Sequence, residues 1–436
     1  MAMIPLRPAA PVPPASPSPP SSAPGPWRAA RLLTAPHRLG FFAAAVLMAA
    51  SALWWAVALF APVLGVVMPW QVPAPLAHGI VMSGSFMPLF IVGFLFTAGP
   101  KWLQAPEVAA PRLLAPVLWL AGGWLVAMLG FHVALSLAAL GVAVSALAWA
   151  ALVARFVGLF PASRATDQLH ARSVAVAAAV GVVAFVGASL ALALGSHDAL
   201  RVATRVAIWG FLAPVFTIVS HRMLPFFTSS ALPMHDAWRP NALLGALLAL
   251  LGISALSELG PLWWWPLPAA VHGTLALALG LGGALVLWLA LRWGLVHSLR
   301  VRLLAMLYGG FVWLGIALGL AAASHARIAL WGESATLGLA PLHALTIGYL
   351  GTTLLAMVTR VAAGHSGRPL VADGPAFAFY LALQAAAVLR VGAALWPQAA
   401  SALSLAAVLA WGAGCVGWAW RYGGWLGRPR VDGREG

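Results

Sequence analysis

Long apolar runs follow one another along most of the chain, separated by short segments rich in Pro, Gly and Arg. A helix needs roughly 20 apolar residues to cross a bilayer, and the runs reach this length. In lipid, backbone polar groups must be paired within the spanning structure, and these runs are too long and continuous for the strands of a membrane barrel. The pattern predicts twelve transmembrane helices, over residues 40–67, 75–98, 111–131, 133–158, 171–195, 200–222, 240–259, 267–291, 302–323, 337–361, 374–395 and 399–422.

The composition excludes a water-soluble protein. Hydrophobic residues make up 62% of the chain and charged residues only 8%, whereas a soluble domain has about 25% charged and at most about half apolar residues. We therefore predict an all-α polytopic membrane protein that uses the lipid bilayer as its solvent. The single cysteine, Cys415, excludes disulfide scaffolds, thiolate zinc sites and cysteine-ligated iron–sulfur clusters.

The two ends of the chain differ from the predicted transmembrane domain, which covers residues 37–425. Residues 1–36 are rich in Pro, Ala and Ser, and such a segment buries too little apolar surface to fold, so we expect a disordered tail. Residues 426–436 form a short basic C-terminal tail.

The distribution of Lys and Arg predicts the orientation. If the N-terminal tail lies inside, the inside segments hold 20 of these residues and the outside segments only four, namely Arg201, Arg205, Arg327 and Arg390. Because positive residues concentrate in cytoplasmic segments, both termini are expected in the cytoplasm. No basic stripe interleaved with aromatic residues occurs outside the apolar runs, so the net charge of +15 does not indicate nucleic-acid binding.

Tryptophans gather near the predicted outer surface, at positions 54, 55, 70 and 263–265. Trp is enriched where a membrane meets water, so we interpret most of these side chains as an aromatic belt.

Three of the twelve histidines share one depth. His78, His272 and His343 each follow a proline at the outer start of an even-numbered span, roughly one to two turns below the surface. Imidazole suits haem iron and copper, so the three predict a haem or metal site. The alternative is that each is a hydrogen-bonded packing residue.

Other residues near this level extend the predicted site. Met82 lies one turn beyond His78, where its thioether could act as a soft ligand, although core packing is the simpler role. Arg201 and Arg205 lie one turn apart at the outer start of span six, where they could clamp haem propionates or another anion, or extend to the lipid headgroups.

A second polar cluster is predicted at the cytoplasmic ends of spans six and ten. It holds two histidines and three arginines, which would converge if the two spans are neighbours: His221, Arg222, Arg360, His365 and Arg368. The cluster predicts a second haem or metal site, or an anion site; anchoring by positive residues is the alternative.

Four segments together resemble the NnrS family of bacterial membrane proteins. They are AHGIVMSGSFMPLFIVGFLFTAGPKW (77–102), RVAIWGFLAPVFTIVSHRMLPFFT (205–228), VHGTLALA (271–278) and LHALTIGYLGTTLLAMVTRVAAGHSGRPL (342–370). The matching motif residues are His78, Arg205, Pro225, His272, His343, Arg360, Gly364, His365, Gly367 and Arg368.

The resemblance implies a twelve-span inner-membrane protein that contains haem b and copper. It further implies a role in denitrification and in tolerance of nitric oxide, iron–nitrosyl species and nitrosative stress, with no settled catalytic reaction.

Two motifs depart from the family pattern. The family's span-two motif usually reads His-Ala-His-Glu, but here the stretch reads Leu76-Ala77-His78-Gly79, so a histidine and an acid are missing. If these help to bind metal in the family, copper occupancy changes here. Ser220-His221 stands where a Gly-Gly pair is common, and this substitution could supply a new ligand.

Three other functions compete with haem binding. A secondary transporter or permease fits twelve spans and predicts solute flux without a bound metal, but no Asp or Glu lies deep in a predicted span; Glu258 comes closest. A terminal oxidase or nitric oxide reductase subunit places two adjacent histidines at copper, and the chain has no His-His pair. A membrane scaffold would bind no haem.

Overall fold

The structure is a computed structural model that describes residues 25–260 and 267–433. Helices make up most of these residues, and no strand occurs among them. Twelve of the helical segments are long and apolar enough to cross a membrane. The all-α fold with twelve spans is thus confirmed.

Nine spans are single continuous helices. They are α1 (Pro36–Phe60), α4 (Pro111–Val133), α5 (Leu135–Val157), α6 (Leu169–Ala193), α9 (Asn241–Leu259), α10 (Ala269–Arg292), α12 (Arg302–Trp331), α15 (Gly374–Leu395) and α16 (Ala400–Leu426).

The other three spans change their winding part of the way across the membrane. Span two breaks at Ser85 and Phe86, between α2 (Ala74–Gly84) and α3 (Met87–Leu103). Span six is α7 (His197–Val206), a π-helical segment η4 (Ala207–Leu212) and α8 (Ala213–Ala231). Span ten is α13 (Ala340–His343), a π-helical segment η7 (Ala344–Gly351) and α14 (Thr352–His365). π-Helical turns are rare and are frequent at functional sites.

Short helices fill several of the connections. They are η1 (Ala29–Leu33), η2 (Pro62–Leu64), η3 (Phe160–Ala162), α11 (Leu295–Ser298), η6 (Glu333–Ala335) and η8 (Pro397–Ala399). The first span ends earlier than predicted, at Phe60, because Pro62 begins η2 and Gly65 takes a left-handed φ of 70°.

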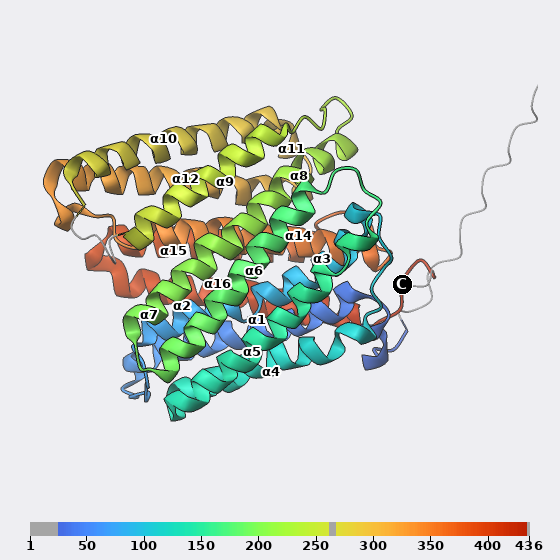
Figure 1. Cartoon of the computed structure of the whole chain (residues 1–436), viewed down its shortest axis with the longest axis horizontal. Helices are drawn as coiled ribbons and strands as arrows, with labels where there is room; N and C mark the ends of the chain where they lie inside the picture. Colours follow the sequence, from blue (N-terminus) through green and yellow to red (C-terminus); the bar gives the residue numbers. More distant parts are fainter. Residues whose placement is uncertain (1–24, 261–266, 434–436) are drawn as a thin grey trace, which may run out of the picture.

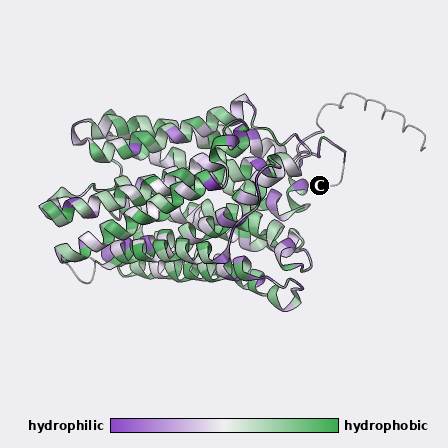
Figure 2. Ribbon diagram, turned by 90° about the horizontal axis from the view of Figure 1, so that it is seen from above, coloured by the Kyte–Doolittle hydropathy of each residue, from purple (hydrophilic) through white to green (hydrophobic). Residues whose placement is uncertain are grey.

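The spans run side by side in one bundle (Figure 1). Consecutive spans pack as hairpins, with α4 on α5, α10 on α12 and α15 on α16, while the first span, α1, packs on the last, α16. Apolar residues dominate the helices along their length, and polar residues concentrate near the ends of the bundle (Figure 2).

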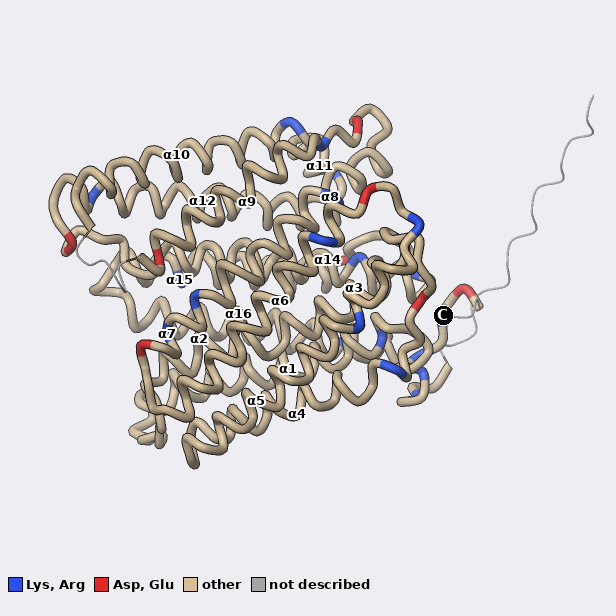
Figure 3. Tube along the Cα trace, in the orientation of Figure 1, with Lys and Arg blue, Asp and Glu red and all other residues tan. Residues whose placement is uncertain are grey.

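Both chain ends lie at the same end of the bundle, which we call the terminal end; we call the other the far end. The Arg28 N–H donates to the Gly427 carbonyl, 2.8 Å away, and Arg38 Nη1 donates to the carbonyls of Leu426 and Arg428, both at 2.8 Å. Of the predicted N-terminal tail, residues 1–24 lie outside the described residues, and residues 29–33 form η1. Most Lys and Arg residues lie at the terminal end (Figure 3).

Candidate functional site: paired histidines at both ends of the bundle

Ten of the twelve histidines interact with a second histidine, eight of them through a direct ring contact or ring-nitrogen contact and the other two, His78 and His343, electrostatically. The five pairs are His78–His343, His272–His325, His170–His221, His37–His365 and His235–His297. In every pair the two residues come from different spans or connections, so the pairing is a property of the folded bundle.

The His343 ring is oriented by a hydrogen bond to the backbone of its own span. Its Nδ1 donates to the Leu339 carbonyl, 2.9 Å away, and because a carbonyl only accepts, Nε2 of the neutral ring keeps its lone pair. Metal-binding histidines usually donate their second ring N–H in this way. The side chain is 9% exposed, at the far end of span ten.

His78 lies close enough to His343 for the two rings to interact electrostatically. One face of His78 stacks on Trp55, with ring centroids 4.0 Å apart, so this tryptophan packs against the site as well as lying near the membrane surface. His78 Nδ1 is buried without a hydrogen-bond partner among the described residues. A buried polar atom without a partner is a position where a ligand or water is expected.

Two arginines lie within electrostatic range of this pair. Arg390 of α15 interacts electrostatically with both His78 and His343, and Arg205 interacts with His343. Arg205 also pairs with Glu258, at 3.0 Å between Nη1 and Oε2. Arg201 instead pairs with Asp198 at 2.6 Å and is exposed.

His272 belongs to a different pair. Its Nδ1 lies 2.8 Å from Nδ1 of His325, and its Nε2 lies 3.3 Å from Oε1 of Glu333. Its helix, α10, packs mainly on α12 and α9, whereas α2, which carries His78, packs mainly on α7 and α4. In Figure 1, α10 runs along the upper edge of the bundle and α2 lies well below it, beside α7. Among the described residues, no three His, Cys, Asp or Glu side chains gather closely enough to hold a metal ion.

The two histidines expected to form the second site have separate partners. His221 Nδ1 lies 3.0 Å from Nε2 of His170, while His221 Nε2 lies 3.3 Å from the Pro240 carbonyl. Nε2 of His221 must donate to this carbonyl, so its Nδ1 accepts from His170. His365 packs against His37, with ring centroids 4.2 Å apart.

The three arginines expected in the same cluster all lie over aromatic rings. The guanidinium carbons of Arg222, Arg360 and Arg368 are 4.9, 4.1 and 4.0 Å from the ring centroids of Trp102, Phe227 and Trp425. Each contact is a cation–π interaction. The Arg360 contact joins span ten to span six. Met82 is partly buried and packs against the apolar core.

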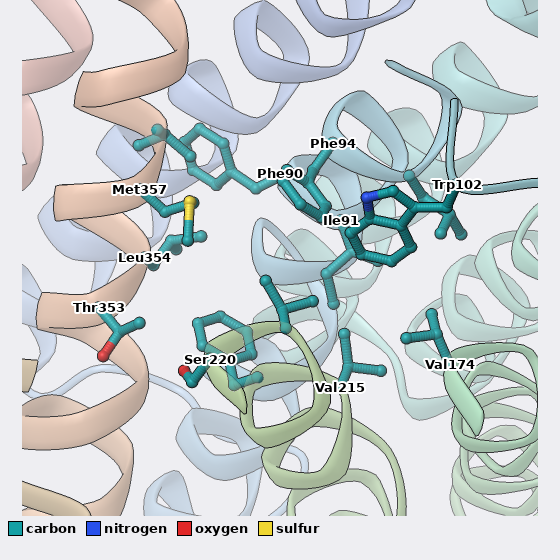
Figure 4. Close-up of a pocket in the computed structure, with 14 residues that line it drawn as sticks. Phe90, Ile91, Phe94, Trp102, Val174, Val215, Ser220, Thr353, Leu354 and Met357 are labelled. Atoms are coloured by element: carbon teal, nitrogen blue, oxygen red, sulfur yellow. The ribbon is translucent and has the colours of Figure 1, made fainter. Parts of the chain in front are cut away.

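An apolar cavity that is partly open to the outside lies between α3, α6, α8 and α14. Phe90, Phe94 and Trp102 line one side and Met357 lies across from them (Figure 4). Its polar lining includes Ser220, whose hydroxyl lies 3.3 Å from that of Tyr349 in η7. Ser220 therefore links the two spans that contain π-helical segments.

Sequence reasoning missed the partners of the histidines it selected. In the sequence these partners can be recognised only as polar residues near span ends: His37, His170, His325 and Arg390. Which residue each of them interacts with depends on how the helices pack. The one signal in the sequence for such a partner is that Arg390 lies close to the end of its apolar run.

The comparison with known proteins agrees with the resemblance found in the sequence. The family model described as NnrS protein matches residues 31–430, which is nearly the whole chain. No curated protein matches the chain. A match of this extent covers all twelve spans and both histidine-rich ends, and the chain belongs to the NnrS protein family.

Proposed function

We propose that the protein binds haem b at the far end of the bundle and takes part in the bacterial response to nitric oxide and nitrosative stress. Membership of the NnrS family supports the link to nitric oxide. The His78–His343 pair is the observation that carries the haem assignment. By the distribution of Lys and Arg, we infer an inner-membrane protein with both termini in the cytoplasm and this pair near the periplasmic face.

The residues of the pair fit haem. His343 presents an Nε2 lone pair fixed by the Leu339 carbonyl, and His78 has a buried ring nitrogen without a partner among the described residues. Imidazole nitrogen is a common axial ligand of haem iron. When bound, haem would supply an iron centre to which nitric oxide can coordinate.

The arginines beside the pair would bind the anionic propionate groups. Arg390 has no acidic partner among the described residues, whereas Arg205 already pairs with Glu258. Guanidinium groups bind carboxylates through paired N–H donors. We therefore assign the main propionate contact to Arg390, with Arg205 in support, and Trp55 holds the His78 ring in place.

Nitric oxide is small and nearly apolar, so it dissolves in lipid and in apolar spaces between helices. The cavity beside Phe90 and Met357 offers such a space within the bundle. It lies nearer the terminal end than the His78–His343 pair, and we propose it as a place where nitric oxide partitions.

The described residues do not fit a copper site of the usual composition. Protein copper sites use several imidazole and sulfur ligands, but among the described residues no three His, Cys, Asp or Glu side chains lie close enough together to hold a metal ion, and the only cysteine, Cys415, is buried. We derive no role for copper.

Absorption spectroscopy tests the proposal. Protein purified from cells supplied with haem should show a Soret band that shifts when nitric oxide is added. The band should weaken strongly in H343A and H78A and should persist in H197Q, because His197 is exposed and belongs to none of the five pairs. A wild-type protein without a Soret band would overturn the haem assignment.

A further inference from the structure

We propose that the terminal end contains a binding site for a phosphate group, formed where the start of α1 meets the ends of α3 and α14. The site comprises Arg31, His37, Arg38, Lys101, His365 and Arg430. It lies at the opposite end of the bundle from His78 and His343, so it does not depend on the proposed haem.

Close contact between two helices builds the site. A Cβ on Gly40 would lie only 2.6 Å from the backbone nitrogen of Gly93, so α1 and α3 touch backbone to backbone. This contact lies one turn after His37 and Arg38, and a Cβ on Gly93 would lie 3.3 Å from the His37 Cα, so His37 lies against the middle of α3. Lys101 lies about two turns further along α3, within electrostatic range of His37 and His365. The C-terminal segment closes the other side, because Arg430 Nη1 donates to the His365 carbonyl, 3.3 Å away.

The positive charges at this site interact with one another. Arg38 interacts electrostatically with Arg31 and Arg430, and both histidines interact with Arg38, Lys101 and Arg430. Asp432 pairs with Arg430 at 2.6 Å. Among the described residues no ion pair to Arg31, Arg38 or Lys101 is found, and the positive side chains of the site outnumber its one described carboxylate, Asp432.

Several donors at the site are buried without acceptors. Arg38 is 3% exposed, and although its Nη1 binds two carbonyls, its Nε has no partner among the described residues. Nε of Arg31 is likewise a buried donor without a partner among the described residues. Nδ1 of His37, also 3% exposed, has no partner there either, and it donates when it carries the ring proton. Anchoring by positive residues would leave charged groups in water or at headgroups, whereas buried donors require an acceptor.

A phosphate group satisfies these requirements best. It carries negative charge and several acceptor oxygens, and clusters of arginine with lysine are typical phosphate-binding groups. Lys101 is exposed, so the site opens to the surroundings. The phosphate could belong to an anionic lipid headgroup or be free in solution, since both offer the same chemistry.

The test uses the double variant R31Q/K101Q. It removes two positive charges of the site but keeps the hydrogen bonds from Arg38 to the carbonyls of Leu426 and Arg428, so the fold is preserved. The matched control is R155Q/R172Q, which makes the same change in charge at exposed positions of the terminal end outside the site.

Two measurements distinguish the sources. In uncharged detergent, the midpoint of thermal unfolding is followed with sodium phosphate and with sodium chloride at equal ionic strength; a ligand that binds only the folded state raises the midpoint. In nanodiscs, native mass spectrometry counts retained phosphatidylglycerol against phosphatidylcholine.

We expect R31Q/K101Q to weaken binding of inorganic phosphate or of phosphatidylglycerol at least tenfold, and R155Q/R172Q to behave as wild type. If R31Q/K101Q loses the rise of the unfolding midpoint with sodium phosphate, the ligand is free phosphate. If it loses the retained phosphatidylglycerol, the ligand is a lipid headgroup. If both double variants match wild type in both arms, or both lose binding equally, the site does not exist. The haem spectrum of each variant, read in parallel, keeps this result separate from the haem proposal.

Discussion

At the scale of single residues, polar side chains in this protein are arranged mainly by partners on other helices. His132 illustrates the point, since Nδ1 lies 2.7 Å from the Pro69 carbonyl and Nε2 lies 2.8 Å from Nε1 of Trp54. Both ring nitrogens are occupied, so His132 is a structural residue, while His78 and His343 each retain a ring nitrogen that has no hydrogen-bond partner in the part of the chain that the structure describes. The distinction depends on contacts and could not come from residue type.

The hydrogen bond between Ser220 and Tyr349 gives a prediction at this scale. The two hydroxyls join α8 to η7 inside the membrane, where a hydrogen bond between helices contributes about 0.6 kcal/mol on average. In a double-mutant cycle of unfolding in detergent, S220A and Y349F should show a coupling of this order. S229A serves as the control, because Ser229 bonds only within its own helix, and its effect should add to that of Y349F. Strict additivity of S220A with Y349F would contradict the contact.

At the scale of elements, the spans could be predicted but their irregularities could not. Each run of about 20 apolar residues must form a helix to pair its backbone in lipid, so the number of spans followed from the sequence. The π-helical segments η4 and η7 have the same apolar composition as regular helix, and their winding depends on neighbours. For the same reason His272 was grouped with His78, although its helix packs elsewhere.

The contact between α4 and α5 gives a prediction at the element scale. A Cβ on Gly141 would lie 2.5 Å from both the Ala127 nitrogen and the Gly123 oxygen, so G141A should separate the helices and cost about 1–3 kcal/mol. G122A is the matched control, because nothing lies within 4 Å of its Cβ position and alanine favours helix by about 1 kcal/mol. Unfolding in detergent measures both; equal stability of the two variants would show that the close contact is absent.

At the scale of the whole molecule, charge and chemistry are divided between the two ends. The terminal end holds most Lys and Arg residues (Figure 3) and the proposed phosphate site, while the far end holds the His78–His343 pair. The sequence predicts which end faces the cytoplasm, because the positive-inside rule uses only the distribution of Lys and Arg along the chain.

Cysteine labelling tests this orientation. The native Cys415 is fully buried, so it should stay unreactive as a background. In intact cells, a membrane-impermeant maleimide should label S334C, at the far end, and should label T166C, at the terminal end, only after permeabilisation; both positions are exposed. The opposite result, with T166C labelled in intact cells and S334C only after permeabilisation, would show that the orientation is reversed and that His78 and His343 lie near the cytoplasm.

The most direct measurement of the central claim is chemical rescue of the haem ligand. H343G removes the imidazole that Leu339 orients and leaves space for a free imidazole molecule. We predict that H343G, purified after expression with ample haem, has a several-fold lower haem-to-protein ratio than wild type. Expression and purification with imidazole should restore the ratio and the Soret band. An unchanged haem content in H343G, or a loss that imidazole does not reverse, would contradict haem ligation by His343.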